Sequence, residues 1–320
     1  MSVVVPTFHR DETLLRLLDT LAAQDLPRDR FEILVVDDAR SRSTPAAVAA
    51  FAAGQPGLRI RTLPGRSRGP ATARNIGWRA AVAPVIAFID DDAYPARPDW
   101  LRQGIAAFER PEIDAAVGAI RVPADEPPTD FQRNVKNLET ADFLTCNAFC
   151  RRSALERVGG FDPAFRVPFR EDSDLQFRIE DSGGMIVRLP AAIVIHPAPP
   201  GRFGVSLRLQ RYSLYNALLY KKHPGRYRAE IQRWPPLGYY GMVASALGSL
   251  GALATGRRRG AAALALAWLV LEGRFFVRRL HGASHRPRHL LDLLVTSALI
   301  PWLSIYWRLR GAWRFRVWFL

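Results

Sequence analysis

The stretch Val85–Asp92, with the sequence VIAFIDDD, runs five apolar residues directly into three carboxylates. An unbroken apolar run of this length, rich in β-branched and aromatic side chains, is typical of a strand buried on both faces of a parallel sheet. Such a strand delivers its last residues to the carboxyl edge of the sheet, where α/β folds bind ligands. A helix N-cap would also favour Asp, but one Asp satisfies that role. Three adjacent carboxylates repel one another, and this favours a divalent cation that carries a phosphorylated substrate.

The chain before this stretch alternates short apolar strands with helical segments. Such alternation implies right-handed βαβ units and a mostly parallel sheet, so the fold class is α/β. The predicted strands are Ser2–Val5, Phe31–Val36, Leu58–Leu63 and Val85–Ile89, and the predicted helices begin at Asp11 and Ser43 and span Ala71–Ala81.

Polar side chains follow several of these strands. In a parallel sheet, Thr7, Asp37, Asp38 and the three acids after Ile89 would meet at one edge. An Asp at the end of an early strand commonly accepts hydrogen bonds from a ribose hydroxyl. The loop 65–70 leads into a helix that carries Arg74, and it can bring cations and backbone N–H groups to a diphosphate. A nucleoside diphosphate held by a metal fits this edge better than NAD, because no glycine-rich dinucleotide loop is present.

Several motifs, in order along the first two hundred residues, carry a family resemblance. They are VVVPTF at 3–8, VVDD at 35–38, GPATARNIG at 69–77, FIDDD at 88–92, and Asn147 with GGFD at 159–162 and REDSDL at 170–175. The chain resembles the family 2 glycosyltransferases. The resemblance implies a GT-A fold, which is Rossmann-like with helices on both faces of the sheet. It also implies transfer of a sugar from a nucleotide sugar with inversion at the anomeric carbon.

The resemblance implies a role for each residue that matches a family motif. Asp38 looks like the base- or ribose-binding carboxylate, and Asp90 and Asp92 look like the ends of the DXD motif. Asp90 is expected nearer the ribose and as a second metal ligand, with Asp92 on Mg²⁺ or Mn²⁺. Asp91 occupies the variable middle, is counted among the residues that bind the nucleotide sugar, and is expected to be the most replaceable of the three. The remaining implied residues are Pro6, Thr7 and Arg74 for the nucleotide sugar, His196 as a further metal ligand, Asp172 with Glu171 for catalysis, and Asn147 and Asp174 for the acceptor.

An inverting transfer is a single displacement, and it needs a carboxylate near the acceptor hydroxyl and positive charge on the leaving group. Asp172 is the expected base, and Glu171 beside it is expected to raise its pKa by like-charge repulsion. Without the resemblance, residues 171–174 would read as an acidic helix N-terminus. The family usually shows Gly-Ser after the second-strand Asp, whereas this chain has Ala39-Arg40-Ser41, so the nucleotide stays open among UDP, GDP and dTDP. The processive Gln-x-x-Arg-Trp motif is absent after the base, which favours the addition of a single sugar.

The positive charge of the chain lies in its last third. The formal net charge is +15, yet residues 201–320 hold 20 Lys and Arg against only Glu230, Glu272 and Asp292. We therefore expect a catalytic domain at 1–200, a basic linker at 201–235 and a membrane-associated helical region at 236–320.

Three apolar segments support a membrane role for this region: Leu237–Thr255, Ala261–Val277 and Leu290–Trp307. Their lengths approach that of a membrane span, but basic residues lie between and after them and should stay on the cytoplasmic side. We therefore expect interfacial helices or a re-entrant hairpin against anionic headgroups at the cytoplasmic face, rather than three simple spans. A soluble helical subdomain is the alternative. The long apolar runs have no role in nucleic-acid binding, so no nucleic-acid partner is expected.

The sequence thus predicts a metal-dependent inverting glycosyltransferase that acts on a lipid-linked or envelope-glycan acceptor. Two alternatives stay open: a non-catalytic nucleotide-sugar-binding membrane protein, and a nucleotidyltransferase. The second alternative would normally have a glycine-rich basic phosphate loop near the N-terminus, and residues 7–10 do not form one. Cys146 and Cys150 are expected to be reduced, buried thiols.

Overall fold

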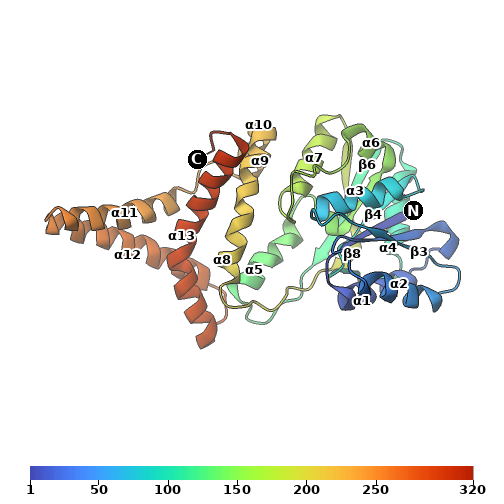
Figure 1. The fold of residues 1–320 in the computed structure, drawn as a ribbon, viewed down its shortest axis with the longest axis horizontal. Helices are drawn as coiled ribbons and strands as arrows, with labels where there is room; N and C mark the ends of the chain where they lie inside the picture. The colour runs from blue at the N-terminus through green and yellow to red at the C-terminus, as the bar shows by residue number, and fades with distance from the viewer. Residues whose placement is uncertain (320) are drawn as a thin grey trace. The chain divides into compact units, whose positions relative to one another are not determined.

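The computed structural model describes residues 1–319, and the chain forms two compact units (Figure 1). The first unit contains Met1–Pro123 and Lys136–Ala198. The second contains Ala124–Val135 together with the chain from Pro199 onward. The sequence-based division placed one boundary close to this point, at 200, but it did not assign the segment 124–135 to the C-terminal helices.

The first unit is built on one eight-stranded sheet with the strand order β3-β2-β1-β4-β7-β6-β8-β5. The strands β3, β2, β1 and β4 run parallel, as expected, whereas β7 pairs antiparallel with both β4 and β6, and β5 pairs antiparallel with β8. The sheet is therefore mixed. The strands are β1 (Ser2–Thr7), β2 (Glu32–Asp37), β3 (Arg59–Pro64), β4 (Val85–Phe88), β5 (Tyr94–Pro95), β6 (Ile113–Arg121), β7 (Ala148–Arg151) and β8 (Met185–Ile195).

Helices cover both faces of this sheet, and each face has its own apolar core. The helices are α1 (Asp11–Ala22), α2 (Ser43–Ala53), α3 (Pro70–Ala80), α4 (Trp100–Ala106), α6 (Arg152–Val158) and α7 (Glu171–Asp181). Side chains alternate along β1, so that Val3 and Val5 pack with α1, α2 and α4, while Val4 packs with α3, α6 and α7. The four leucines of α1 at helical spacing are all buried, as their pattern predicts.

Close approaches fix how the helices sit on the sheet. A Cβ on Gly77 would lie 2.3 Å from Val4 Cγ1, so α3 can contact β1 only through a glycine. Gly69, which precedes α3, has a φ of 91° and would place a Cβ 2.2 Å from the Arg166 carbonyl oxygen. Glycine is therefore required at both positions, and the helix that carries Arg74 is held firmly against the sheet.

The second unit is helical and includes the segment 124–135 from the middle of the chain. Its helices are α5 (Asp130–Lys136), α8 (Val205–Leu209), α9 (Leu214–Lys222), α10 (Pro224–Arg226), α11 (Leu237–Ala254), α12 (Arg258–Leu280) and α13 (Pro287–Phe315). The Asp130 carboxylate joins this segment to the rest of the unit, since it accepts from Arg279 Nη2 at 2.6 Å and lies 3.1 Å from His289 Nε2. Arg279 also donates to Ser297 Oγ at 2.8 Å, which links α12 to α13.

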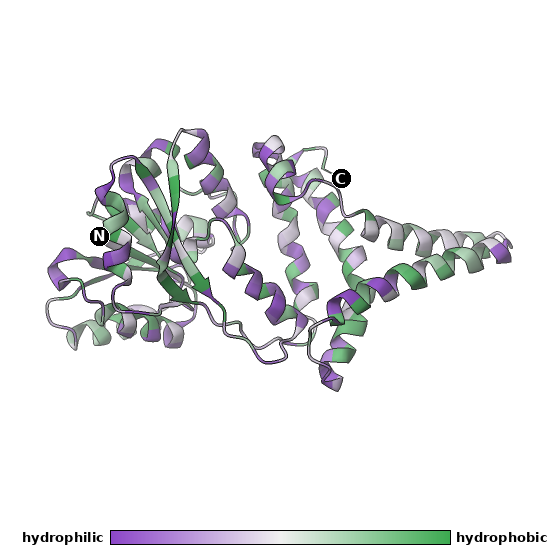
Figure 2. Ribbon diagram, turned by 180° about the vertical axis from the view of Figure 1, so that it is seen from behind, coloured by the Kyte–Doolittle hydropathy of each residue, from purple (hydrophilic) through white to green (hydrophobic). Residues whose placement is uncertain are grey.

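Three helices of this unit are long and apolar enough to cross a membrane: α11, α12 and α13. Helices α11 and α12 form a hairpin whose base packs on α13 through Met242, Phe275 and Ile300. Figure 2 shows mostly hydrophobic residues along the hairpin and hydrophilic ones at its tip, where residues 257–259 are all Arg. Only 11% of the apolar window of α11 and of α12 is buried, against 33% for α13.

Candidate active site

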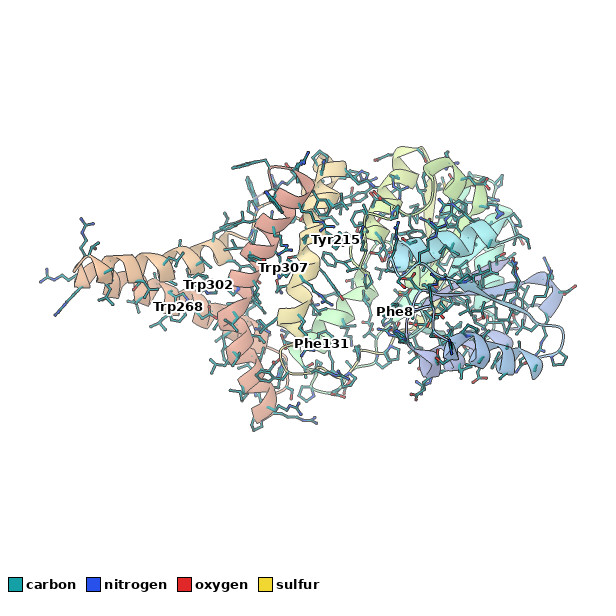
Figure 3. All side chains as sticks on the ribbon, viewed as in Figure 1. Phe8, Phe131, Tyr215, Trp268, Trp302 and Trp307 are labelled. Atoms are coloured by element: carbon teal, nitrogen blue, oxygen red, sulfur yellow. The ribbon has the colours of Figure 1, made fainter. Side chains whose placement is uncertain are left out.

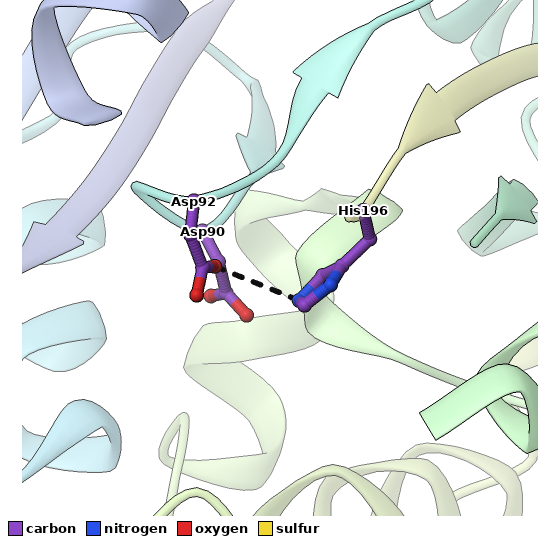
Figure 4. A group of neighbouring side chains, drawn as sticks. All are labelled: Asp90, Asp92 and His196. Carbon is purple, nitrogen blue, oxygen red and sulfur yellow. Dashed lines mark ion pairs between the residues drawn. The ribbon is translucent and has the colours of Figure 1, made fainter. Parts of the chain in front are cut away.

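The carboxyl edge of the sheet brings Asp90, Asp92 and His196 together (Figure 4). One potential ligand atom from each of the three lies within 4.8 Å of the others, and His196 Nε2 lies 3.5 Å from Asp92 Oδ1. The pairing of β5 with the end of β8 produces this approach, because it places the turn after Asp92 beside His196. The two carboxylates suit Mg²⁺ or Mn²⁺, and all three side chains remain partly accessible.

Arg10 also binds this acidic turn, and the sequence analysis did not single it out. Its Nη1 lies 3.2 Å from Asp91 Oδ1 and also forms an ion pair with Asp92 Oδ2. The residue before it, His9, has a φ of 54°, which turns the chain sharply after β1. The three adjacent carboxylates predicted a positive charge beside them, and the guanidinium of Arg10 is such a charge within the chain itself.

Asp91 is the buried member of the acidic run, with 5% of its surface exposed. Thr7 Oγ1 donates to its Oδ2 at 2.7 Å, and Arg10 contacts its other oxygen. Burial raises the pKa of Asp91 to about 6, although the hydrogen bond from Thr7 and the charge of Arg10 act in the opposite direction. We expected the middle carboxylate to be the most replaceable and to face the nucleotide sugar. Its position instead ties the acidic turn to the end of β1.

Arg74 connects the acidic turn to the start of α7. Its Nη2 lies 2.8 Å from Asp90 Oδ1, its Nη1 lies 3.0 Å from Glu171 Oε1, and Asp172 Oδ1 is 4.0 Å away. Burial alone would lower the pKa of Arg74, but Asp90, Asp172 and Glu171 raise it above its usual value. The guanidinium therefore stays charged and holds carboxylates from both motifs at one place.

Asp172 accepts a hydrogen bond from Thr145 Oγ1 at 2.6 Å. Burial raises the pKa of Asp172 above its ordinary value, while Arg74 and Thr145 act against that rise. The Asp90 carboxylate adds to this rise. Burial, and then the charge of Asp172, raise the pKa of Glu171. Thr145 could not be found from the sequence, because it lies far from Asp172 along the chain.

Asp38 is buried against the loop that leads into α3. Its Oδ1 accepts from the Arg66 N–H at 3.0 Å, and its Oδ2 accepts from the Gly69 N–H at 2.8 Å. Pro6 and Thr7 end β1 in register with Val36 and Asp37, so the predicted residues of strands 1 and 2 do meet at one edge. In this structure the Asp38 side chain orders the loop 65–69, and a base or ribose contact stays a prediction.

The two residues predicted to bind the acceptor lie inside the protein, where their side chains bond to other protein groups. Asn147 is fully buried, donates to the Ala119 and Ala192 carbonyl oxygens at 2.8 Å each, and accepts from Trp100 Nε1 at 2.9 Å. Asp174 is also fully buried and pairs with Arg178 at 2.8 Å. Neither side chain offers a free polar group to an acceptor. In this structure both residues hold elements together, and their contact with an acceptor stays a prediction.

Residues 2–159 match the family described as "Glycosyl transferase family 2". Residues 2–159 form a family 2 glycosyltransferase domain. This glycosyltransferase is 25% identical to glycosyltransferase AglE of Haloferax volcanii over 66% of its own length and 70% of that protein. It is 29% identical to validoxylamine A glucosyltransferase of Streptomyces hygroscopicus subsp. limoneus over 57% of its length, and it spans about half of that relative (48%).

Solved structures confirm the fold. Mannosyltransferase PcManGT of Pyrobaculum calidifontis, solved with GDP-Man and Mn²⁺, aligns with a TM-score of 0.60 and 21% identity, covering 98% of this chain and 87% of that one. The predicted GT-A fold and the assignment to the glycosyltransferases are therefore confirmed, and inversion is typical of family 2.

Proposed function

We propose that this glycosyltransferase moves one sugar from a nucleoside-diphosphate sugar to an acceptor hydroxyl, with inversion and with Asp172 as the general base. The observation that carries this proposal is the double ion pair of Arg74. It joins Asp90 of the acidic turn to Glu171, the residue next to the proposed base, at 2.8 and 3.0 Å. The donor-binding acids and the base carboxylate thus occupy one site.

Each side chain has a defined task in this reaction. Asp172 Oδ accepts the proton of the acceptor hydroxyl, and Thr145 orients that carboxylate through its hydrogen bond. Glu171 and Arg74 are positioning residues, because Arg74 is almost fully buried and contacts carboxylates on both sides. Asp90, Asp92 and His196 would hold Mg²⁺ or Mn²⁺, which when bound supplies positive charge for the departing diphosphate. The complex of PcManGT with Mn²⁺ supports this choice of metal.

The proposed donor is a UDP-, GDP- or dTDP-linked sugar, held by Asp38, Thr7 and the ribose-side oxygen of Asp90. The proposed acceptor is a lipid-linked or cell-envelope glycan at the cytoplasmic face of the membrane. The three long apolar helices of the second unit support the membrane location. The absence of the processive motif after Asp172 supports transfer of a single sugar, and no nucleic-acid partner is proposed.

The substitution Asp172→Asn tests the base assignment. It should leave the affinity for the nucleotide sugar unchanged and reduce transfer by about 10²–10⁴-fold, as for loss of a general base. Donor affinity is measured by calorimetry, and transfer by release of nucleoside diphosphate with a range of acceptors. Asp181→Asn, at the other end of α7, is the matched control and should transfer normally. Near-normal transfer by Asp172→Asn would refute the assignment.

The substitution Asp92→Ala tests the metal site. We expect that Mn²⁺ no longer strengthens binding of the nucleotide sugar to this variant, because one of the three candidate ligands is lost. Calorimetric titrations of the donor with and without Mn²⁺ measure this dependence. If Mn²⁺ strengthens donor binding equally in the variant and in the original protein, the ion binds elsewhere.

A further inference from the structure

A cavity of about 800 Å³ opens along the base of the hairpin formed by α11 and α12. Helix α11 contributes Tyr239 and Met242, and α12 contributes the residues from Leu269 to Val277 that face them. Tyr239 and Phe275 both line the groove, and their rings are in edge contact with centroids 5.4 Å apart. The groove belongs to the second unit alone and has no part in the proposed transfer site.

The walls of this groove are apolar and open. Leu269, Val270 and Val277 expose 56%, 53% and 62% of their surface. The groove stays open because two of its lining residues, Gly238 and Gly273, have no side chain, and a Cβ added to either would meet nothing within 4 Å. Exposed apolar surface costs about 25 cal/mol per Å² in water, so these walls favour an apolar occupant.

One end of the groove is basic. Arg274 and Arg278 lie one helical turn apart on α12, and His281 follows them just beyond its end. Within the described residues 1–319, no Asp or Glu lines the cavity. The neighbouring Arg279 provides a contrast, since Asp130 neutralises it at 2.6 Å. Arg274 and Arg278 are therefore placed to receive an anion from outside the chain.

We infer that this groove binds one anionic phospholipid of the bilayer. Its phosphate would accept from the Arg274 and Arg278 guanidinium groups, whose planar donors match phosphate oxygens. One acyl chain would lie along Leu269 and Val270, which precede both arginines on α12. The axial rise from Leu269 to Arg278 is about 13.5 Å at 1.5 Å per residue, so this apolar wall and the charge of Arg278 are separated along α12 as chain and headgroup are in a lipid.

The combination of apolar walls and a basic end favours a lipid over the other possible occupants of the groove. A free phosphate would leave the apolar walls exposed, and an apolar peptide would leave the two arginines without an anion. A phospholipid covers the apolar walls with its acyl chain and provides an anion for the two arginines with its phosphate. The inference rests on the membrane location proposed above, but it does not depend on the sugar-transfer chemistry.

The test uses the full chain in nanodiscs that contain phosphatidylcholine alone or with phosphatidylglycerol. After transfer to mild detergent, native mass spectrometry counts the lipids that stay bound. The double variant Arg274→Gln/Arg278→Gln should bind phosphatidylglycerol about tenfold or more weakly, since each Arg near a membrane surface contributes roughly a fewfold in affinity. The matched control is Arg257→Gln/Arg258→Gln at the hairpin tip, which removes the same charge outside the groove and should retain the lipid.

A second variant tests the groove by volume instead of charge. Gly273→Leu should displace the lipid while keeping both arginines, and it should fold because its Cβ meets open space and Leu favours a helix more than Gly does. Gly251→Leu on α11 is the control, since its site is equally open but lies outside the groove.

Several outcomes would overturn the inference. They are equal loss of lipid in the tip control, full retention in Gly273→Leu, equal binding of phosphatidylcholine, or a mass showing a second copy of the chain in place of a lipid. Failure of the proposed membrane location gives a different result, because the chain would then enter no nanodisc at all. Sugar transfer by the groove variants to a soluble acceptor analogue, measured in parallel, separates either failure from a loss of the enzyme's chemistry.

Discussion

Two arginines, one exposed and one buried, balance the acids of the transfer site. Arg10, whose side chain is 52% exposed, pairs with the two later acids of the turn, whereas Arg74, at 3%, pairs with Asp90. The two arginines therefore differ in how easily each can leave its carboxylate partners. Arg74 cannot leave without exposing unpaired buried carboxylates, but Arg10 can move into solvent at little cost.

Arg10 is accordingly expected to compete with the metal for Asp92. The variant Arg10→Ala should bind Mn²⁺ about tenfold more tightly in the absence of donor, because a competing cation is removed beside the ligands. Calorimetric titration of Mn²⁺ measures this. Arg16→Ala, an exposed arginine on α1, controls for the change in net charge. Unchanged or weaker Mn²⁺ binding in Arg10→Ala alone would show that Arg10 does not compete.

Thr145 is expected to set the pH dependence of transfer. Its hydroxyl stabilises the ionised form of Asp172, so Thr145→Val should raise the pKa of that carboxyl further. The base acts when deprotonated, so the acid limb of the kcat profile should move to higher pH, and the loss of rate should be greater at pH 6 than at pH 8. Thr145→Ser retains the hydroxyl and should restore the profile. A uniform loss at every pH would indicate a structural role only.

At the scale of secondary-structure elements, the side chain of Asn147 links β6, β8 and α4. It precedes β7, and its amide bonds the carbonyls of Ala119 on β6 and Ala192 on β8 and the indole of Trp100 on α4. A Cβ on Gly118 would lie 2.2 Å from its Nδ2, so the sheet is shaped around this side chain.

Loss of that amide should destabilise the first unit. Asn147→Ala leaves three buried polar partners unsatisfied, which should lower the free energy of unfolding by about 3 kcal/mol or more at 1–3 kcal/mol each. Urea unfolding followed by near-ultraviolet circular dichroism of the full chain in detergent measures the change. Asp172→Asn should unfold nearly as the original protein does. If Asn147→Ala is as stable as the original protein but loses acceptor affinity, the predicted acceptor role would be supported instead.

Local sequence patterns predicted which segments form helices and strands, but they predicted less well which strands pair with one another. The burial of β1, β2 and β4 and the leucine face of α1 follow from periodicity within each segment. The antiparallel half of the sheet depends on pairing between distant segments, which no local pattern contains. The same holds for the candidate site. Its carboxylates could be identified from the sequence. The burial of Asn147 and Asp174 and the contacts of Arg10 and Thr145 could not, because they depend on turns such as those at His9 and Arg170, where φ is positive.

At the scale of the whole molecule, the three apolar helices are not equivalent. The hairpin exposes large apolar side chains on both of its helices, among them Leu250 and Leu266. Helix α13 is one-sided instead, since Leu293 and Ile300 are buried while Leu294, Trp302 and others are exposed. Figure 3 shows Trp268 on the hairpin and Trp302 and Trp307 on α13. A hairpin whose two helices both expose large apolar side chains between its basic ends suits the hydrocarbon, whereas a helix with one apolar face suits the interface.

We therefore predict that the hairpin inserts more deeply than α13. Cysteine introduced as Leu250→Cys or Trp302→Cys can be labelled selectively, because Cys146 and Cys150 are buried. Spin-labelled lipids should quench a fluorophore at position 250 best when the label lies deep in the chains, and one at position 302 best when it lies near the headgroups. Equal depth at both positions would place the hairpin in the interface too.

The path of the chain through Asp130 also has a consequence for how the protein is made. The segment 124–135 is synthesised well before its partners, since Arg279 and His289 follow Asp130 by 149 and 159 residues. Translation must therefore pass residue 289 before both contacts of Asp130 can form, although every residue of the first unit has been made by residue 198. A transcript cut short near codon 200 would encode the first unit together with an Asp130 that lacks both of these partners.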